Sequence, residues 1–584
     1  MLAALSVVLV PQSIGFNYNL WSNSLDDYFD KYYILSGISD GFDIGWIDGT
    51  EPTYVHNPTI QTSDVDKLDI LNWVLKRHAS GILLGPFTDQ NCPFKNLHFS
   101  PLFTVLKPDL VQRVVAHLSY PKWGTSVNDC IEESAKHVEY IYFVEVAQFV
   151  YSLGFNAKLW VLDAKDAYYR VPVKEKYWRY MAIKWMGLIF VFTSLQMGLG
   201  SACAIYQRFA DAILYIIRHR SGELFICLSG GYYIHHYLDD FFGGHSDELT
   251  AWNQLVCATR WFYDLGIPTQ LKKLKFPHVW QIILGWLYDT RTLTVSLPPA
   301  KVTAYTAHII KIIRERQKGA NKKQLERING ELQHAAVAVY PGKAKLRNIQ
   351  HAMHLELYNY SDKIILSDAV INDLKWWVFA LKHMNGIPLK WVISDSTEFH
   401  EEIWTDAALK GDMKVGGMGG CTLSNFAYQI NNDETIMSEV SKLRKGIDIK
   451  LLELIAVYCF VAVLAPNLQY KNIKIWCDND TAVWALIKKR APLIRRDMNF
   501  VVNKFCELSV QYHFRFWIEH IKGDDNVMAD NLSRFKELYK TDQIDPTKFT
   551  FVDKSEVLKV LNDTFNEMRN FKRVPRNDDD PLKN

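Results

Sequence analysis

Two aspartates stand side by side in the stretch YIHHYLDDFFGGH, residues 233 to 245, among aromatic and aliphatic residues suited to a core. An unpaired buried charge is very costly, so buried acids in proteins are usually paired or bind a metal ion. One interpretation of Asp239 and Asp240 is therefore a metal site. The other is a hairpin turn, where aspartate is common and solvated. The stretch alone favours the turn, and the rest of the chain must decide.

A third aspartate follows another strand-like run. In KLWVLDAKDAYYRVPV, Asp163 stands at the end of an apolar segment. If that strand lies beside the hairpin around Asp239 and Asp240, three carboxylates meet at one end of a sheet. Oxygen-rich clusters of this kind hold Mg²⁺, a hard cation that prefers carboxylates and substrate phosphates. Two such ions about 4 Å apart can activate an attacking oxygen and stabilise a leaving one.

A second group of acids lies in the C-terminal part of the chain. Asp406 and Asp478 each follow a strand-like apolar run. Glu453 lies in the apolar helical stretch IDIKLLELIAVYCFVAVLA, where an acidic residue is unexpected unless it has a function. Asp480 competes with Asp478 for one place in the set, and Asp478 is favoured because it directly follows its strand. The set is Asp406, Glu453, Asp478 and Asp530, with His520 ten residues before the last acid.

The elements that must position these side chains mix helix and strand. A helical stretch and short strands are expected over 61–130, and helices mixed with apolar strands over 131–290. A long basic helical region follows to about 385. The last block reads as a strand, a Gly-rich hairpin at KVGGMGGCTL, the apolar helix and a further strand. The glycine cluster lacks the Lys-Ser/Thr ending of a phosphate loop.

Bulk composition bounds the class of protein. The chain has 584 residues, 48% hydrophobic and 13% aromatic, and a formal net charge of +2, which suits several domains with cores. We expect no apolar run near the ~20 residues of a membrane helix. The opening MLAALSVVLVPQS is interpreted as a buried segment rather than a signal peptide. Nine cysteines without a CxxC pair argue for a reducing compartment and against a zinc module.

Charge is unevenly distributed despite the near-neutral total. Residues 301–350 hold eleven Lys/Arg against Glu315, Glu326 and Glu331. A stripe of this kind suits a phosphate backbone, although a solvated helix face is the usual alternative.

These motifs, in this order, resemble those of reverse transcriptases. YLDD is similar to their YxDD box, and VLDAKDAYYRVPV is similar to their first palm motif, about 75 residues earlier. SLQMGLGSACAIYQRF resembles the box between them, GIPTQLKKLKF the next one, and ILGWLYD the primer grip. The fingers motifs are resembled by three segments: SPLFTVLKPD, RVVAHLSYP and SVNDCI. Their residue patterns are most similar to those of DIRS-like retroelements, which use a tyrosine recombinase.

The resemblance implies a role for each matching residue. Asp163, Asp239 and Asp240 would be the metal ligands, and Lys273 would protonate the leaving pyrophosphate, although Lys272 and Lys275 compete for that place. Tyr168 would be the steric gate that excludes a 2′-hydroxyl. Lys107 and Arg113 would hold the triphosphate, with a surface cation as the alternative for each. The remaining matches to the nucleotide and template site are Ala167, Met197, Gly198 and Gln207.

The chain also departs from the family pattern. Gln196 and Cys203 stand where the family usually has proline, and Met197 replaces a residue that touches the incoming nucleotide. Ala116 and His117 differ from the residues that the family commonly has in this fingers motif. These departures put fidelity and rate in doubt, but not the metal site.

The C-terminal order Asp, Glu, Asp, His, Asp resembles RNase H, and NVMADNLSR is close to its ending in retrotransposons. The resemblance implies that Asp406, Glu453, Asp478 and Asp530 hold two Mg²⁺ that drive water into the RNA strand of an RNA–DNA hybrid. His520 would assist proton transfer or product release. The run IKKRAPLIRR could grip the hybrid, or it could be a solvated face.

The sequence therefore predicts an α/β (α+β) chain: a right-hand polymerase of fingers, palm and thumb, followed by an RNase H-like α/β domain. The predicted segments are an N-terminal extension at 1–60, fingers and palm at 61–290, thumb or connection at 291–395, RNase H-like domain at 396–536, and a partly ordered tail at 537–584.

The predicted activity is RNA-directed DNA polymerisation fused to hybrid-specific RNA cleavage. It implies two Mg²⁺ ions per site, with Mn²⁺ as a substitute. The expected partners are an RNA template, a DNA primer, dNTPs and RNA–DNA hybrid, and no membrane is expected. The expected location is intracellular, cytoplasmic or nuclear. Recombinase or capsid proteins would be on separate chains. The alternatives are a domesticated or decayed element that binds nucleic acid without polymerising, and a nuclease whose polymerase half is structural. An RNA-copying RNA polymerase is disfavoured by Tyr168.

Overall fold

The computed structural model describes residue 8 and residues 15–55, 64–106, 112–227, 231–340, 342–353, 363–393, 399–409, 416–431, 448–492, 494–541 and 544–572. The chain forms two compact units, Met1–Thr294 and Val295–Asn584. Apart from Val8, the opening segment lies outside the described residues, so its predicted burial is not addressed.

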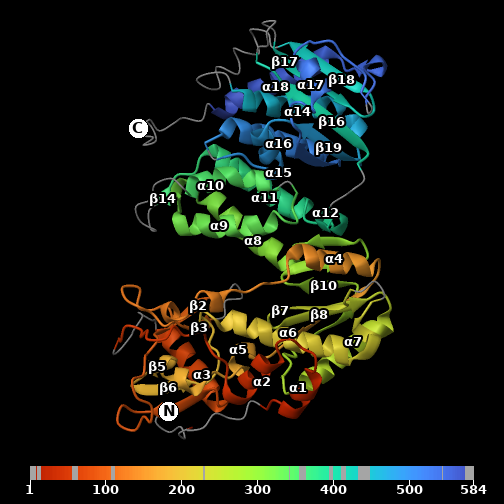
Figure 1. Ribbon diagram of the computed structural model, residues 1–584. Coiled ribbons are helices and arrows are strands. Elements are labelled where there is room, and N and C mark those ends of the chain that lie inside the picture. The colour runs from red at the N-terminus through yellow and green to blue at the C-terminus, as the bar shows by residue number, and fades with distance from the viewer. Residues whose placement is uncertain are drawn as a thin grey trace. The chain divides into compact units, whose positions relative to one another are not determined.

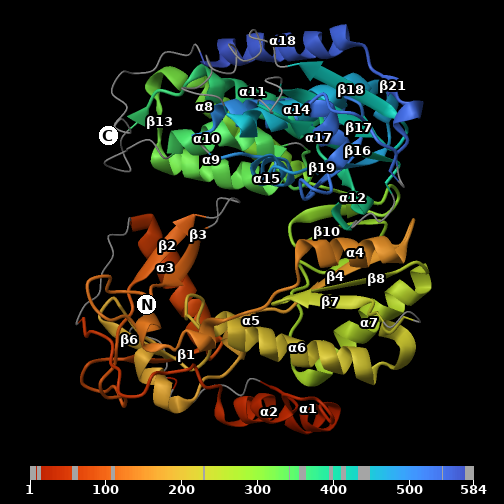
Figure 2. The same ribbon diagram turned by 45° about the horizontal axis from the view of Figure 1, so that its top comes forward.

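The first unit contains a four-stranded sheet, a three-stranded sheet and a two-stranded hairpin. Helices α6 and α7 cover one face of the four-stranded sheet, and α4 lies on the other (Figure 2). The elements are α1 (Tyr18–Ser24), α2 (Lys31–Asp40), α3 (Asp64–Ala79), β1 (Leu83–Phe87), β2 (Leu102–Leu106), β3 (Gln112–Ala116), α4 (Phe143–Leu153), β4 (Lys158–Asp163), α5 (Ala167–Arg170), β5 (Ala182–Trp185), β6 (Leu188–Phe192), α6 (Ala202–Arg220), β7 (Ile234–Tyr237), β8 (Asp240–His245), α7 (Glu248–Leu265), β9 (Lys275–His278), β10 (Trp280–Ile283) and β11 (Trp286–Asp289), with β12 (Thr294–Ser296) at the boundary.

Strand order in the four-stranded sheet is β7-β8-β4-β9, with every neighbour antiparallel. The strands are short and largely buried because helices cover the sheet. Glycine is required where α4 and β4 come close to β8: a Cβ at Gly243 would lie 2.3 Å from the Trp160 ring, and one at Gly244 would lie 2.7 Å from the Lys158 carbonyl oxygen. The strand end at Asp163 is thereby held directly against β8.

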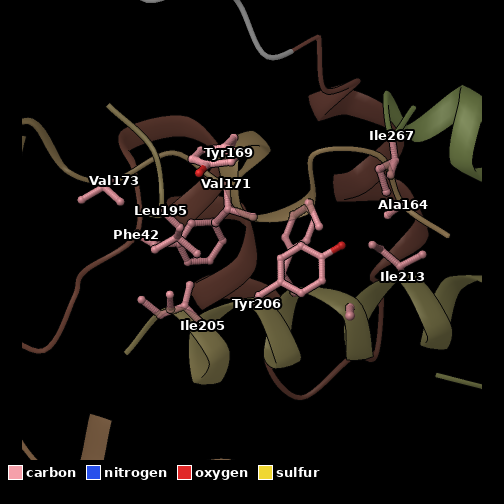
Figure 3. Close-up of a cluster of buried hydrophobic side chains, with 14 of the residues drawn as sticks. Phe42, Ala164, Tyr169, Val171, Val173, Leu195, Ile205, Tyr206, Ile213 and Ile267 are labelled. Atoms are coloured by element: carbon pink, nitrogen blue, oxygen red, sulfur yellow. The ribbon is translucent and has the colours of Figure 1, made fainter. Parts of the chain in front are cut away.

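The N-terminal extension belongs to the core of this unit. Trp21 is fully buried, donates from Nε1 to the Leu265 carbonyl at 3.0 Å and stacks on Phe209. Figure 3 shows Phe42 of the extension beside Leu195 and Ile205, in the cluster that contains Tyr206. No motif in the sequence identified this segment, because its packing partners lie far away along the chain.

The second unit combines a helical part with a six-stranded sheet of order β20-β19-β16-β17-β18-β21. β16, β19 and β20 are parallel, and β16, β17 and β18 are antiparallel. Figure 1 labels its main elements, and their bounds are α8 (Pro299–Arg314), β13 (Ala320–Asn321), α9 (Lys322–Ala335), α10 (Arg347–Met353), β14 (Lys363–Ile364), α11 (Asp368–His383), β15 (Ile387–Pro388), α12 (Leu389–Ile393), β16 (Glu401–Ala407), β17 (Gly417–Thr422), β18 (Phe426–Asn431), α14 (Ile449–Leu464), β19 (Asn472–Cys477), α15 (Asp480–Ile487), α16 (Arg496–Gln511), β20 (Arg515–His520), α17 (Val527–Ser533), β21 (Thr550–Phe551) and α18 (Lys554–Lys572).

Helix α14 is the central helix of this unit. Together with the turn after it, Ile449–Leu468 is long and apolar enough to cross a membrane by length and composition, so the expectation that no run approaches that length is wrong. Most of this segment is buried against the sheet, α16 and α18, as in the core helix of a globular domain.

The structure adds detail to two further expectations. The glycine cluster belongs to a hairpin, as predicted, because β16 and β17 pair antiparallel. Its glycines from Gly417 onward form the buried strand β17, and α17 packs so closely on them that a Cβ at Gly419 would lie 2.5 Å from the Ser533 nitrogen. The C-terminal tail, expected to be partly ordered, contains α18, and its buried residues Val557, Leu561, Phe565 and Met568 join the core around α14. Their i, i+4, i+8, i+11 spacing marks one apolar face of a helix.

Candidate active sites

Three carboxylates meet at the end of the four-stranded sheet. Asp163, the last residue of β4, pairs in register with Asp240, the first residue of β8. The Ala164 amide donates to the Asp239 carbonyl at 3.0 Å, which holds the β7–β8 turn against β4. Leu238 has a φ of 50°, the left-handed conformation that makes this turn tight. The convergence predicted from the two motifs is present, so Asp239 and Asp240 are in a tight turn that also forms part of an acidic cluster.

The cluster carries more negative charge than its surroundings neutralise. Asp163 is buried, and Asp239 and Asp240 are half-buried. Burial and the nearby Asp163 raise the pKa of Asp239, and burial together with Asp163 and Asp239 raises the pKa of Asp240 to about 7. Repulsion between close, desolvated carboxylates of this kind is relieved by protonation or by a bound cation.

Lys273 is the nearest side-chain cation in the described part of this site. Its Nζ lies 2.5 Å from Asp163 Oδ2. Partial burial lowers the pKa of Lys273, but the hydrogen bond to Asp163 and the charges of Asp240 and Asp239 outweigh it and raise the pKa overall. One ammonium group therefore faces three carboxylates, while the side chain of Lys272 is exposed and Lys275 lies within β9.

Tyr168 lies beside the acidic cluster on the short helix α5, which follows β4. Its ring packs on Tyr206 of α6 with centroids 5.2 Å apart, and its hydroxyl lies 3.2 Å from Cys203 Sγ. Ala167 is buried beneath the same turn. The phenol is thus held by packing on one side and by a thiol at its tip.

The segment SLQMGLGSACAIYQRF, between the two aspartate motifs, is hydrogen-bonded to the predicted fingers through Asn128. The Asn128 amide donates to the Gly198 carbonyl at 2.9 Å and accepts from the Gly200 amide at 2.8 Å. Gly198 has a φ of 103°, and a Cβ there would lie 3.2 Å from the Ala116 carbonyl oxygen. Sequence reasoning did not single out Asn128, because its partners are about seventy residues away; its place in the SVND box was the available signal.

The other predicted nucleotide contacts are placed as follows. Arg113 is exposed on β3, and its positive charge lowers the pKa of Asp239, against the larger effects of burial and Asp163 that raise it. Lys107 lies outside the described residues. Met197 is 39% exposed, and Gln207 on α6 points its amide toward Asp211 at 3.5 Å.

The departures from the family pattern are accommodated within the packing. Gln196 is buried and donates from Nε2 to the Met181 carbonyl at 3.1 Å. Cys203 occupies the first turn of α6 and contacts Tyr168. Neither residue disturbs the pairing of β4 with β8.

The second group of acids also meets at strand ends. Asp406 is near the end of β16, and Asp478 directly follows the neighbouring parallel strand β19. Glu453 of α14 is buried, and its carboxylate lies with Cys477 and Asp478 in one cluster whose potential ligand atoms are within 4.8 Å of one another. Asp530 comes from α17, which packs on β16 and β17. The structure brings all four predicted acids to one edge of the sheet.

Burial dominates the electrostatics of this second cluster. It raises the pKa of Asp406 to about 6, and with Asp406 and Asp478 it raises the pKa of Glu453 well above its usual value. The pKa of Asp478 is also raised, first by burial and then by Asp530. Close acids with raised pKa values, such as Asp406, Glu453 and Asp478, are expected where a cation completes the site.

Neighbouring side chains orient these acids. Ser533 donates its hydroxyl hydrogen to Asp406, and Arg534 and Lys536 pair with Asp530. His520, at the end of β20, is exposed, with Nε2 3.0 Å from the Asp478 carbonyl oxygen and 3.7 Å from Asp480. Sequence reasoning missed Ser533 and Arg534, although their spacing of three and four residues after Asp530 on a helix was the signal. Arg495 of the basic run is buried between Asp448 and Asp497, so it is not a contact for a hybrid.

Comparison with known proteins bears on the first unit most directly. Residues 106–319 match the family model described as reverse transcriptase (RNA-dependent DNA polymerase). The chain carries a reverse transcriptase domain. The match contains β3, both aspartate motifs and Lys273, and it supports RNA-directed DNA polymerase activity. The predicted fold class, a mixed helix and strand fold of the reverse transcriptase polymerase type, is confirmed.

Three solved structures of a foamy viral protease–reverse transcriptase are similar to this chain. One, a dRH form in complex with double-stranded DNA, has a TM-score of 0.46 and 13% identity over 88% of this chain and 84% of that one. A second, in complex with RNA/DNA hybrid, has a TM-score of 0.44 and 12% identity over 91% of this chain and 86% of that one. A third, in complex with double-stranded DNA, has a TM-score of 0.44 and 14% identity over 89% of this chain and 99% of that one. No curated protein sequence matches the chain.

Proposed function

We propose that this chain is an RNA-directed DNA polymerase fused to a ribonuclease H, encoded by a DIRS-like retroelement. The observation that carries the polymerase half is the meeting of Asp163, Asp239 and Asp240 at one sheet end, inside the region matched by the reverse transcriptase family. The assignment to this subfamily rests on the residue patterns of the fingers motifs alone.

Both acidic clusters fit divalent metal ions. Their donors are carboxylate oxygens, which hard cations prefer. Burial and repulsion from neighbouring acids raise the pKa of Asp240 in the first cluster and of Glu453 in the second. Asp163, Asp239 and Asp240 would hold the ions of the polymerase site, and Asp406, Glu453, Asp478 and Asp530 those of the nuclease site. When bound, two Mg²⁺ ions, or Mn²⁺ as a substitute, would activate the attacking oxygen and stabilise the leaving one.

The remaining polymerase residues bind and orient the nucleotide. Arg113, exposed on β3, supplies positive charge for the triphosphate, and Lys107 is proposed for the same role. Tyr168 stands where it would exclude a 2′-hydroxyl. Lys273, with its raised pKa, carries the proton that the departing pyrophosphate takes up as the primer 3′-oxygen attacks the α-phosphate. Gly198, held by Asn128, allows the backbone to approach the nucleotide.

In the nuclease half, the chain's own residues orient the acids and move protons. Ser533 fixes Asp406, and Arg534 holds Asp530 in place. His520 is exposed beside Asp478, where it can take up or release a proton as the hybrid's RNA strand is cleaved. Cleaving the template after it has been copied is the reason for joining the two activities in one chain.

We also propose the partners that this chemistry requires: an RNA template, a DNA primer, dNTPs and the resulting hybrid, with the remaining retroelement proteins on other chains. The basic helices α8 and α9 are suited to a phosphate backbone, although Arg327 of α9 is already paired with Glu331. The location proposed is inside the cell, in the cytoplasm or nucleus.

Reciprocal variants of the full chain test the proposal. Primer extension is measured on poly(rA)/oligo(dT) with dTTP and Mg²⁺, and RNA release is measured on a preformed hybrid. Asp239→Asn should abolish extension and leave RNA release intact, whereas Asp478→Asn should do the reverse. Folded wild-type protein that extends no primer with either Mg²⁺ or Mn²⁺ would overturn the polymerase assignment. Retained RNA release would then identify a nuclease with a structural polymerase half, and hybrid binding without either activity would identify a decayed element.

A further inference from the structure

One residue that the chemistry described above does not use touches the proposed sugar gate. Cys203, half-buried in the first turn of α6, has its Sγ 3.2 Å from the hydroxyl oxygen of Tyr168. The ring of Tyr168 is supported from one side by Tyr206, which is buried, with the two ring planes 41° apart. Packing on Tyr206 therefore restricts the position of the ring, and the hydroxyl itself is within hydrogen-bonding distance of the thiol.

Cys203 is also linked, through Tyr140, to the turn that carries the catalytic aspartates. The phenol of Tyr140 interacts with the Cys203 thiol, and its ring stacks on Tyr237 at 4.7 Å and 26°. Tyr237 is the last residue of β7 and pairs in register with Asp240. The thiol thus stands between Tyr168 on one side and, through Tyr140, the YLDD turn on the other.

We propose that Cys203 is a positioning residue, which sets the place of the Tyr168 hydroxyl and thereby the selectivity for deoxynucleotides over ribonucleotides. The inference rests on the proposed polymerase function and deepens it. The two substrates differ by one oxygen atom at the 2′ position. A pocket wall that must reject one additional hydroxyl achieves only about a hundredfold selectivity, so a small movement of the wall changes the ratio measurably. A thiol is a weak hydrogen-bond partner, and a group of another size would move the phenol.

A double-mutant cycle on the full chain tests this role. The ratio of kcat/KM for dTTP to that for 5-methyluridine triphosphate, which differs only in the 2′-hydroxyl, is measured for wild type, Cys203→Ala, Tyr168→Phe and the double variant. Cys203→Ala should lower the ratio by about fivefold to tenfold. Because the effect passes through the phenol oxygen, it should be absent in the Tyr168→Phe background.

Cys257 provides the matched control. It is also half-buried, lies on α7, and its Sγ is 3.3 Å from the hydroxyl oxygen of Ser221, outside the acidic cluster. Cys257→Ala should leave the ratio unchanged. An unchanged ratio in Cys203→Ala, or equal effects of Cys203→Ala with and without the Tyr168 hydroxyl, would overturn the proposal, because a purely structural role would change stability without this coupling.

A second measurement does not require turnover. The rate of maleimide labelling at Cys203 is followed by peptide mapping with Mg²⁺ and either nucleotide. We expect dTTP to slow labelling more than 5-methyluridine triphosphate does, and Tyr168→Phe to remove that difference. If wild-type protein extends no primer, the polymerase proposal fails, and this labelling difference still decides the role of Cys203. Equal labelling with both nucleotides, or no protection by either, would overturn it.

Discussion

At the scale of single residues, Lys273 is the side chain with the most specific prediction. It is the ammonium group hydrogen-bonded to Asp163 amid three carboxylates, and its neighbour Lys272 is exposed. Lys273→Met should lower kcat for primer extension by about a hundredfold, the scale of a lost general acid. The Mg²⁺ concentration for half-maximal rate should not rise, because removing a cation leaves the carboxylates more attractive to a metal ion.

Primer-extension rates titrated with Mg²⁺ check this expectation, with Lys272→Met as the control that keeps its wild-type rate. An equal loss in both variants would mean that positive charge in this segment, rather than the Lys273 ammonium, supports the reaction. A higher Mg²⁺ requirement in Lys273→Met would mean that this lysine helps to assemble the metal site.

Asp373 gives a prediction for the dependence of stability on pH. It is buried on α11, accepts a hydrogen bond from the Asn348 amide at 2.8 Å, and burial raises its pKa from 3.8 to about 6. The folded state therefore binds more protons than the unfolded state between pH 4 and 6, so stability falls as pH rises through this window. Asp373→Asn keeps the acceptor oxygen and removes the charge. The variant should be more stable than wild type by up to about 3 kcal/mol above pH 6, and similar to it near pH 4.

Urea unfolding of wild type and variant between pH 4 and 8 measures this difference. Asp563→Asn, exposed on α18, is the matched control for removing a carboxylate from a helix surface. A constant difference for Asp373→Asn across the range would show that burial does not shift this carboxyl group.

At the scale of elements, strand β17 depends on its glycines. A Cβ at Gly419 would lie 2.5 Å from the Ser533 nitrogen and 2.6 Å from Leu532 Cβ, so α17 would have to move. Gly419→Ala should destabilise the second unit by about 1–3 kcal/mol, as other overpacked sites do. It should also lower RNA release, because α17 carries Asp530. Gly330 of α9 has nothing within 4 Å of such a Cβ, so Gly330→Ala should stabilise its helix by about 0.5–1 kcal/mol.

Denaturation curves and RNA-release assays of the two glycine variants make the comparison. If Gly419→Ala is as stable as Gly330→Ala, the close approach of α17 to β17 is not a constraint on the sheet.

The same elements explain what the sequence could and could not predict. The β4–β8 pairing was foreseeable because apolar strand patterns end at Asp163 and begin at Asp240. The second acidic cluster was foreseeable for the same reason at Asp406 and Asp478. The glycine cluster indicated the hairpin correctly, but it did not indicate the close contact of β17 with a helix, because only the position of α17 shows that contact. Asn128 escaped notice, and Cys203 was noticed only as a departure from the family pattern, because each acts through a contact distant in sequence.

At the scale of the whole molecule, the two compact units each have a core of their own, and the N-terminal extension is part of the first. Trp21 is the clearest link: it is fully buried, stacks on Phe209 of α6 and bonds the end of α7 at Leu265. Trp21→Ala should therefore destabilise the first unit by about 3–5 kcal/mol. The second unit, which contains the proposed nuclease, should keep its unfolding midpoint.

Proteolysis along a urea gradient, read by fragments assigned to each unit, would show the two transitions in the full chain. Trp123, 73% exposed, is the matched control, and Trp123→Ala should move neither transition. Primer extension should fail for Trp21→Ala at denaturant concentrations where RNA release persists. If both activities are instead lost together, the units unfold as one, and the extension stabilises the whole chain rather than the polymerase half.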